Sequence, residues 1–249
     1  MTFGMTFDFS AVAKHYATYR PTYPPELATE LAARCSRREL AWEVGCGSGQ
    51  LTASLAPHFA RVVATDSSQA QLDAAARLAN VEFRRATAEA SGLGDHAADL
   101  IVAAQAAHWF DWPAFVAETT RVAAPGALAA LVSYGIVEVD DAPALARYYH
   151  ETLSGFWPPE RRHVENGYRD LRWPWSELEP PKLAMRAQWT RDELVGYATT
   201  WSATARLVAQ RGQAVFDAFR DELARDWPGN ERREIRWPLT LRLARVAQQ

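Results

Sequence analysis

Three glycines stand within five residues of one another, at Gly45, Gly47 and Gly49 in the segment AWEVGCGSGQ (41–50). An apolar run precedes them. A glycine-rich turn between a strand and a helix lets a ligand approach the backbone, because no Cβ stands in the way. The first turn of the following helix also offers N–H groups to an anionic or polar ligand group. These residues predict a ligand-binding turn.

Asp66 ends the next apolar run, RVVATD (61–66), 21 residues after Gly45. In a doubly wound sheet, a carboxylate at this spacing accepts hydrogen bonds from the hydroxyls of a ribose. A helix N-cap is the purely structural alternative for such an aspartate. The glycines and the aspartate together predict a nucleoside-containing cofactor at the carboxyl ends of the strands.

The glycine spacing bears on which nucleoside cofactor is bound. A dinucleotide fold uses G-x-G-x-x-G, because a pyrophosphate must lie against the turn. Here the last glycine comes one residue early and is followed by Gln50. Glu43 lies two residues before Gly45, where its charge would repel a pyrophosphate but tolerate an ammonium group. A nucleoside that carries an amino-acid tail satisfies both conditions.

Alternating strands and helices must position these residues. Short apolar runs predict strands at 40–44, 62–65, 81–85, 99–104 and 127–132. Amphipathic stretches predict helices at 25–33, 51–59, 69–78 and 112–122. This alternation is typical of βαβ units in a parallel sheet with right-handed crossovers, which is the α/β class.

The second half of the chain has a different pattern. Residues 140–181 are rich in Trp, Pro, Arg and Tyr with little periodicity, and we interpret them as a lid or insertion. Helices are expected at 192–198 and 205–225, and a long final strand at 234–246. Pro238 interrupts that strand, which indicates an edge position or a bulge.

Composition limits the classes of function. The chain has 249 residues, 48% of them hydrophobic, and a net charge of −3, which suits one large α/β domain or a domain with an insertion. Basic residues are dispersed until the C-terminal third, so we expect no nucleic-acid partner. Cys35 and Cys46 form no disulfide framework and have no metal-ligand spacing, so we expect no metal. No signal-peptide pattern or long apolar run is present, so we expect a soluble, cytoplasmic protein without a membrane partner.

Three motifs resemble those of the class I S-adenosylmethionine-dependent methyltransferases of type 11. They are EVGCGSG (43–49), DSS (66–68) and ATAEA (86–90). The segments HYATYRPTYP (15–24), AHWFD (107–111) and TWSA (200–203) are similar to the trans-aconitate methyltransferase-like group of small-molecule enzymes. The resemblance implies a Rossmann-like doubly wound sheet of about seven strands, with the last strand antiparallel and a helical lid.

The resemblance also implies a domain organisation and a cofactor. One methyltransferase domain would span 1–249, with an N-terminal cap at about 1–36, a cofactor-binding core at about 37–139, the lid at about 140–181 and C-terminal helices and a strand at 182–249. The cofactor would be S-adenosyl-L-methionine, with S-adenosyl-L-homocysteine as product. The partner would be a small-molecule methyl acceptor.

Site residues follow by carrying the family motifs onto this chain. The implied cofactor-binding residues are Tyr16, Arg20, Glu43, Gly45, Cys46, Gly47, Gly49, Asp66, Ser67, Gln71, Thr87, Ala88 and Gln105. The glycine turn would carry the methionine portion, Asp66 the ribose, and Gln71, Thr87 and Ala88 the adenine. Thr87 stands where the family usually has an aspartate. Arg20 could pair with the cofactor carboxylate, with a surface ion pair as the alternative.

The sequence does not determine the chemical class of the methyl acceptor. A carboxylate acceptor is ionised at pH 7 and needs no base, whereas a hydroxyl or amine could need one, with His108 as first candidate. His108, Trp109 and Trp201 form the expected substrate pocket. An anionic acceptor would favour arginines of the lid, whereas a ring-bearing acceptor would favour its tryptophans. The arginines are Arg161, Arg162 and Arg172, and the tryptophans, with Trp201, are Trp157, Trp173 and Trp175. Plain packing is the alternative for His108 and for most of these tryptophans.

Three other functions compete with a small-molecule methyltransferase. One is a protein that binds S-adenosylmethionine without catalysis. Another is an NAD(P)-dependent oxidoreductase, which the glycine spacing and the absence of lysine between Lys14 and Lys182 disfavour. The last is a nucleic-acid methyltransferase, disfavoured because QAAH (105–108) stands where amino-methylating enzymes carry an Asn/Asp-Pro-Pro-aromatic motif.

Overall fold

The computed structural model describes residues 21–247. The chain forms two compact units, a sheet unit and a helical unit. The sheet unit contains 22–137, 160–185 and the chain from 237 onward, and the helical unit contains 138–159 and 186–236. The expected lid segment is divided at residue 160, with its first part in the helical unit and its second part in the sheet unit.

The strands of the described chain form one hydrogen-bonded set with the order β3-β2-β1-β4-β5-β9-β6, and β7 and β8 also pair with β9. Their bounds are β1 Leu40–Val44, β2 Arg61–Asp66, β3 Val81–Arg85, β4 Ala98–Ala104, β5 Ala123–Tyr134, β6 Glu138–Val139, β7 Glu177–Leu178, β8 Ala184–Trp189 and β9 Arg233–Arg245. The α/β class and the antiparallel last strand are confirmed. The number of strands is nine rather than about seven, because three short strands pair with the long β9.

The five strands β3, β2, β1, β4 and β5 run parallel, as predicted. The first strand of the chain, β1, lies in the middle, with β2 on one side and β4 on the other. The chain therefore adds β2 and β3 on one side of β1 and then β4 and β5 on the other side. In doubly wound folds, this change of side leaves a crevice at the carboxyl ends of the two central strands, here β1 and β4. The glycine turn follows β1 at that place.

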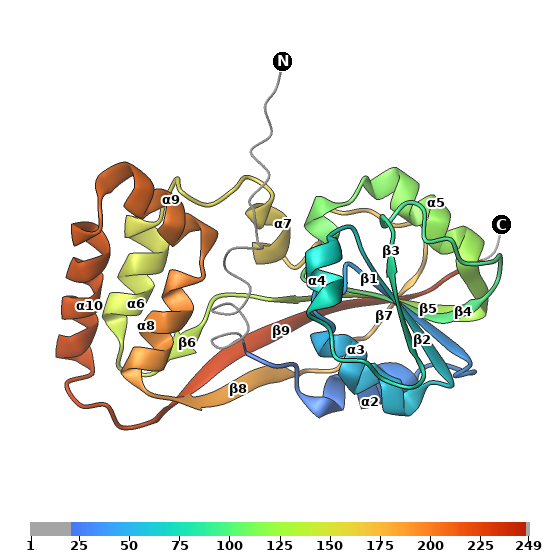
Figure 1. Ribbon diagram of the computed structural model, residues 1–249, viewed down its shortest axis with the longest axis horizontal. Helices are drawn as coiled ribbons and strands as arrows, with labels where there is room; N and C mark the ends of the chain where they lie inside the picture. The colour runs from blue at the N-terminus through green and yellow to red at the C-terminus, as the bar shows by residue number, and fades with distance from the viewer. Residues whose placement is uncertain (1–20, 248–249) are drawn as a thin grey trace, which may run out of the picture. The chain divides into compact units, whose positions relative to one another are not determined.

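Helices cover both faces of the sheet unit, as Figure 1 shows for α2 and α3 on one side and α5 on the other. The helices of this unit are α2 Pro25–Ala33, α3 Gln50–Leu55, α4 Gln69–Asp73, α5 Trp112–Val122 and α7 Arg161–Glu165. Leu27 and Leu31 of α2 lie one turn apart and pack with Ala41 of β1. The next residue of β1, Trp42, packs with Phe115 of α5 on the opposite face. β1 is therefore buried on both faces.

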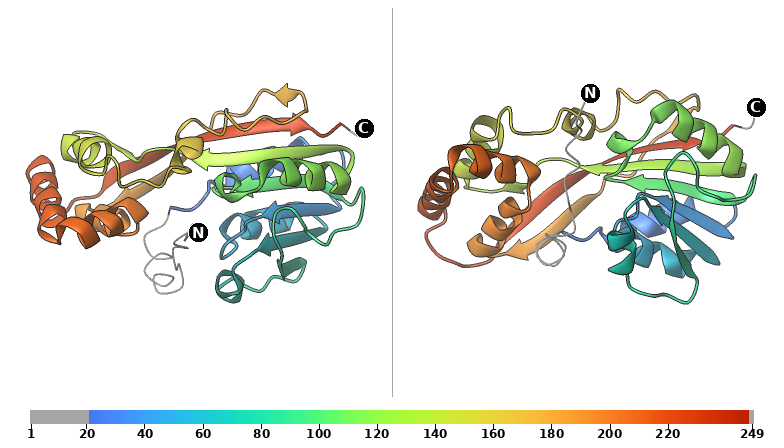
Figure 2. Two further views of the ribbon diagram at one scale, coloured as in Figure 1. Left: turned by 90° about the horizontal axis from the view of Figure 1, so that it is seen from above. Right: turned by 45° about the horizontal axis from the view of Figure 1, so that its top comes forward.

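β9 runs antiparallel beside β5, as Figure 2 shows in its left view. Residues 239–245 pair with β5, whereas Ile235 and Arg236 pair with β6. Pro238 lies between the two sets of pairs, and its carbonyl accepts a hydrogen bond from the Gly135 N–H at 3.3 Å. The predicted interruption at Pro238 is therefore a change of partner strand within one long strand.

The helical unit contains α6 Pro143–Arg147, α8 Arg191–Thr199, α9 Ser202–Arg211 and α10 Ala214–Asp226. The prediction of one continuous helix at 205–225 was wrong. Gly212 adopts φ +85° and ends α9 before α10 begins. The predicted helix at 69–78 is shorter, since α4 ends at Asp73. The helix predicted at 51–59 becomes α3 and a 3₁₀ turn at Ala56–His58, where Pro57 lacks a backbone N–H.

Within the described residues, none of the helices has both the length and the apolar character needed to cross a bilayer.

Candidate active site

The glycine turn after β1 is built from three residues with positive φ. Gly45, Gly47 and Gly49 have φ values of +67°, +55° and +81°. A Cβ at Gly45 would lie 2.5 Å from the Cβ of Ala106, and one at Gly49 would lie 3.0 Å from the ring of Phe83. Side chains at these positions would be both strained and crowded. The turn therefore presents bare backbone at the carboxyl end of β1.

Asp66 holds this turn and the start of α4 together. Its Oδ2 accepts a hydrogen bond from the Gly47 N–H at 2.9 Å, and its Oδ1 accepts one from the Ser68 N–H at 2.8 Å. Each carboxylate oxygen has a further lone pair that can accept from a ligand hydroxyl. The half-buried carboxylate thus fixes the turn and keeps the capacity to bind a diol.

Glu43 is buried inside β1, with 2% of its surface exposed. Its carboxyl group accepts a hydrogen bond from the hydroxyl of Thr52 in α3. The pKa of Glu43 is raised to about 8: burial is the main cause, the Thr52 hydrogen bond opposes the shift, and the nearby Asp66 adds to it. A buried carboxyl group of this kind gains stability from a cationic partner.

Cys46 lies within the turn and is also buried. Burial and the neighbouring Glu43 and Asp66 raise the pKa of its thiol far above the ordinary value, so the thiol stays neutral. Its backbone is held by the N–H bond to the Thr65 carbonyl at 2.9 Å. Cys46 can therefore contact a ligand only as a backbone group or a small apolar side chain.

The residues expected at the adenine come from two segments beside the turn. The side-chain oxygen of Gln71 lies 3.8 Å from the position that a Cβ of Gly47 would occupy. Thr87 and Ala90 form an isolated bridge that closes a tight turn, with Ala88 buried inside it. The Ala86 N–H bonds to the Asp66 carbonyl at 3.1 Å, which ties this turn to the end of β2. Ser67 is exposed, and its carbonyl accepts from Arg85 at 3.1 Å.

A second turn, residues 105–110, follows β4 and packs against the glycine turn. Gln105 adopts φ +55°, an uncommon conformation for a residue other than glycine. Its backbone N–H donates to the Val132 carbonyl at 2.8 Å and its side-chain amide donates to the Tyr134 carbonyl at 3.0 Å. These bonds offset the strain. Ala106 and Phe110 then lie against Gly45, so the residues between them stand beside the glycine turn.

His108 occupies the middle of this second turn and is half-buried. Its Nδ1 lies 3.2 Å from the hydroxyl of Tyr168. The pKa of His108 is lowered to about 4, mainly by burial and in addition by repulsion from Arg161 and His163. The imidazole is therefore neutral at pH 7. An imidazole with so low a pKa is a weak general base at neutral pH.

The two tryptophans of the expected substrate pocket lie in different units. Trp109 belongs to the sheet unit and is 59% exposed, the one exposed large hydrophobic side chain among residues 21–247. Trp201 belongs to the helical unit and is buried in an aromatic cluster with Tyr148, Tyr149 and Tyr197. Trp109 is thus free to contact a ligand, whereas Trp201 packs in the core of its own unit.

Comparison with known proteins identifies the family. The family model for a methyltransferase domain matches residues 42–131, which contain the glycine turn, Asp66 and the second turn. A Dictyostelium discoideum protein named as a methyltransferase is 31% identical over 221 residues, 86% of this chain and 84% of its own length. The chain belongs to the class I S-adenosylmethionine-dependent methyltransferases.

Two further comparisons agree with this methyltransferase assignment. The solved structure of an Anaeromyxobacter dehalogenans protein described as a type II methyltransferase superposes with a TM-score of 0.88 at 39% identity. The match covers 93% of this chain and 100% of that one. An uncharacterized methyltransferase of Mycobacterium tuberculosis is 36% identical over 129 residues, 51% of this chain and 52% of its own length.

S-adenosylmethionine is the cofactor of this methyltransferase, as for its family. The residues after β1 and β2 fit it. The three positive-φ glycines leave room for a ligand against the backbone, and Asp66 has lone pairs to accept from a ribose diol. Glu43 would supply a buried carboxylate for an ammonium group. Tyr16 and Arg20, which the family resemblance also places at the cofactor, lie outside the described residues.

Sequence reasoning missed Tyr168, which contacts His108 from 60 residues away. Neither residue belongs to a periodic pattern, and no spacing rule connects them. The tyrosine is 1% exposed and its ring stacks on the imidazole with a centroid distance of 6.3 Å. The contact therefore comes from the tertiary structure, and the sequence carries no signal for it.

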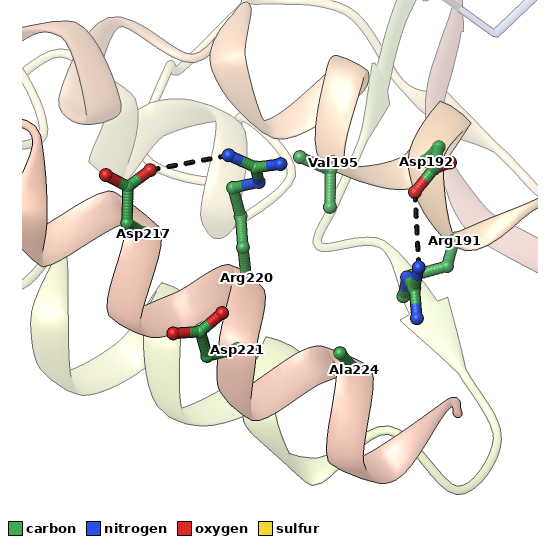
Figure 3. Close-up of a pocket in the computed structure, with 7 residues that line it drawn as sticks. All are labelled: Arg191, Asp192, Val195, Asp217, Arg220, Asp221 and Ala224. Carbon is green, nitrogen blue, oxygen red and sulfur yellow. Dashed lines mark hydrogen bonds and ion pairs between the residues drawn. The ribbon is translucent and has the colours of Figure 1, made fainter. Parts of the chain in front are cut away.

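The methyltransferase also has a surface depression of about 220 Å³ in its helical unit, between α8 and α10 (Figure 3). Two arginines and three aspartates line it, and two ion pairs join them. Asp217 pairs with Arg220 at 3.4 Å, and Asp192 with Arg191 at 3.6 Å. This mixed-charge surface has neither a glycine turn nor a cluster of nucleophiles, so it is no candidate for the cofactor site.

Proposed function

We propose that this methyltransferase methylates a small molecule at a carboxylate oxygen. The observation that carries the proposal is the neutral, half-buried His108, with a pKa lowered to about 4, in the turn whose Ala106 and Phe110 lie against Gly45. A hydroxyl or amine acceptor would need a base, and this imidazole is too weak a base at neutral pH. A carboxylate is already ionised and needs none. The resemblance to the trans-aconitate methyltransferase-like group supports the same acceptor class.

The proposed reaction depends on positioning. When bound, S-adenosylmethionine would supply an electrophilic methyl group: the acceptor oxygen would bond to the methyl carbon as the C–S bond breaks in line with it, and S-adenosylhomocysteine would leave. Gly45, Gly47 and Gly49 would hold the cofactor's amino-acid portion against the backbone, and Asp66 would hold its ribose. The turn at 105–110 would place the acceptor oxygen, since Ala106 packs on Gly45. Correct placement of two reactants contributes up to about 7–11 kcal/mol in intramolecular reactions.

The remaining predicted contacts form part of the same proposal. Gln71, Thr87 and Ala88 would border the adenine, with Ser67 beside the ribose. Gln105, whose amide is held by the Tyr134 carbonyl, would lie below the methionine portion. Trp109 would cover the acceptor with an apolar ring.

A small acceptor is favoured over a nucleic acid by the charge of the chain. The net charge of −3 gives little attraction for a phosphate backbone. We also propose a cytoplasmic location, which the two free, buried cysteines support because disulfides are rare in reducing compartments. We propose that both units belong to one methyltransferase domain.

Transfer of a radiolabelled methyl group from S-adenosylmethionine to an acceptor panel tests the proposal. The panel holds di- and tricarboxylic acids including trans-aconitate, phenols, amines and a nucleic-acid control. We expect label on a carboxylic acid, in a product that releases volatile methanol on mild alkaline treatment because it is a methyl ester. Alkali-stable label on a phenol, an amine or the nucleic acid would contradict the carboxylate proposal.

A further inference from the structure

We infer that Arg161 and the Nε2–H of His108 together bind a carboxylate of the acceptor, and that Tyr168 fixes the imidazole for this task. The inference rests on the proposed function, since it names the groups that recognise the proposed acceptor. It adds the contacts of α7 and of the segment after it, which the proposed function does not use.

Helix α7, Arg161–Glu165, packs against the second turn at Ala107–Trp109. This contact brings Arg161 into electrostatic range of His108, as the lowered pKa of the imidazole also indicates. The arginine side chain is 21% exposed, so part of it is accessible to a ligand. Its ion pair with Glu165 is long, at 3.7 Å. Arg161 is therefore a half-buried cation beside the proposed acceptor position.

The hydrogen bond from Tyr168 determines how His108 presents its two nitrogens. The Tyr168 hydroxyl lies 3.2 Å from Nδ1, and we assign it as the donor. A neutral imidazole has one N–H, so the proton then stays on Nε2. Nε2–H is a donor and not a base. The imidazole therefore offers the acceptor a hydrogen bond, in agreement with a substrate that is already ionised.

The backbone of Tyr168 is fixed by neighbouring residues, so Tyr168 can act as a positioning residue for His108. Arg242 of β9 donates to the Tyr168 carbonyl and, at 2.6 Å, to the Leu171 carbonyl. Arg242 also pairs with Glu177. The preceding Gly167 has φ +66°, and a Cβ there would lie 2.4 Å from a side-chain carbon of Thr240. The segment that carries Tyr168 is thus fixed on β9.

Charge around the imidazole favours an anion. Arg161, which is always charged, opposes protonation of His108 and so favours an anion near the ring. His163 pairs with Asp170 at 2.7 Å, and Arg161 pairs with Glu165 at 3.7 Å. A guanidinium group binds a carboxylate through two parallel N–H bonds. The cluster thus has the charge, donors and exposure that carboxylate recognition requires.

The structure also distinguishes the three arginines that were candidates in the sequence, by their exposure and by their effect on the pKa of His108. Arg162 and Arg172 are exposed on the surface, and neither affects the pKa of His108. Arg162 is the neighbour of Arg161 in the same helix and has the same charge, so it provides a matched control. A substitution at Arg162 changes the net charge of the chain equally.

The test measures binding of tricarballylate, a non-reactive tricarboxylate, to the full-length protein saturated with S-adenosylhomocysteine. Ligand-observed NMR gives the Kd for the wild type and for the Arg161→Gln and Arg162→Gln variants. We expect Arg161→Gln to weaken binding by about tenfold or more, and Arg162→Gln to stay within about twofold. An unchanged affinity for S-adenosylhomocysteine in each variant shows that the protein is folded.

Two results would overturn the inference. One is equal loss of affinity in both variants, since that would mean general electrostatic attraction; the other is no loss in Arg161→Gln. Failure of the proposed function looks different, because tricarballylate would bind through Arg161 while no carboxylic acid accepted the methyl group. Conversely, methyl transfer to a carboxylic acid with unaltered binding in Arg161→Gln would keep the function and reject the site.

A spectroscopic experiment tests Tyr168 separately from its packing. In protein labelled with ¹⁵N-histidine, we expect the His108 signals of the wild type to show Nδ1 as acceptor and Nε2 as protonated. Tyr168→Phe keeps the ring and removes the hydroxyl, so it should shift this tautomer balance and weaken tricarballylate binding. A protonated Nδ1 in the wild type, or identical ¹⁵N spectra in both proteins, would refute the positioning role.

Discussion

At the scale of single residues, Asp66 combines a structural and a ligand-binding task. It already accepts hydrogen bonds from Gly47 and Ser68, so its removal affects the turn as well as the proposed ribose contact. We expect Asp66→Ala to weaken S-adenosylhomocysteine binding by about tenfold or more in calorimetric titration. Asp73→Ala, an exposed change in α4, should bind as the wild type does.

An analogue of S-adenosylhomocysteine without the two ribose hydroxyls separates the two tasks of Asp66. If the carboxylate holds the ribose, the difference between wild type and Asp66→Ala should shrink markedly for this analogue. The same difference for both ligands would mean that Asp66 acts through the turn alone. Equal affinity of wild type and variant for the natural ligand would reject the ribose assignment.

His108 carries a prediction about protonation. Because burial and two neighbouring positive charges lower its pKa to about 4, the ring should stay neutral throughout the neutral range. We expect its NMR signals to remain unchanged from about pH 8 to pH 5.5, and to titrate only below that range. His108→Gln should leave the shape of the pH–rate profile between about pH 6 and 8 unaltered. A titration midpoint near the ordinary histidine value would contradict both statements.

At the scale of elements, the glycine turn and the turn at 105–110 form one packed unit. A Cβ at Gly45 would meet Ala106 while φ is +67°. Gly45→Ala should therefore destabilise the protein by about 1–3 kcal/mol and weaken S-adenosylhomocysteine binding. The matched control is Gly94→Ala, because its Cβ would have open space and its φ is not positive.

Chemical denaturation with and without S-adenosylhomocysteine checks this pair. We expect Gly94→Ala to stay within about 0.5 kcal/mol of the wild type in both conditions. Gly45→Ala should also lose most of the stabilisation that the ligand gives to the wild type. Two variants of equal stability and equal ligand response would show that the turn tolerates side chains.

The elements that local signals define were predictable from the sequence. β1 and α5 were predicted with their observed bounds, because apolar runs and turn residues mark both ends. The break at Gly212 was missed because the amphipathic pattern continues across it. β8 was missed because its pairing with β9 joins distant parts of the chain.

In the candidate site, too, some residues were predictable from the sequence and others were found only in the tertiary structure. The glycine turn and Asp66 lie within 22 residues and carry a spacing signal, so the sequence sufficed for them. The contact of His108 with Tyr168 and the nearness of Arg161 depend on α7 packing against the turn after β4. Three arginines were equal candidates in the sequence, and packing alone distinguishes Arg161 from Arg162 and Arg172.

At the scale of the whole molecule, the buried Glu43 links stability to pH. Its pKa is raised to about 8 in the folded protein, so the folded state keeps a proton that the unfolded state releases above the ordinary glutamate value of 4.5. The free energy of unfolding therefore falls as pH rises from about 5 to 8, and levels off above that range. Glu43→Gln lacks this titration and should lose less stability over the same interval.

Thermal unfolding of the wild type and Glu43→Gln, measured at several pH values without ligand, checks this linkage. We expect the difference in stability to move in favour of the variant by about 1 kcal/mol or more between pH 5 and pH 8, which corresponds to about 2–4 °C in Tm. Thr52→Val removes the hydrogen bond that lowers the Glu43 pKa, so it should extend the dependence to higher pH. Parallel curves for wild type and Glu43→Gln would contradict a buried, protonated Glu43.

We expect the cofactor to lie on the glycine turn with its reactive end toward the turn at 105–110. A crystal structure of the complex with S-adenosylhomocysteine would test this. We expect ribose hydroxyls within about 2.6–3.0 Å of the Asp66 carboxylate and a thioether sulfur that faces the His108 turn. A ribose away from Asp66, or a sulfur that points away from that turn, would contradict it.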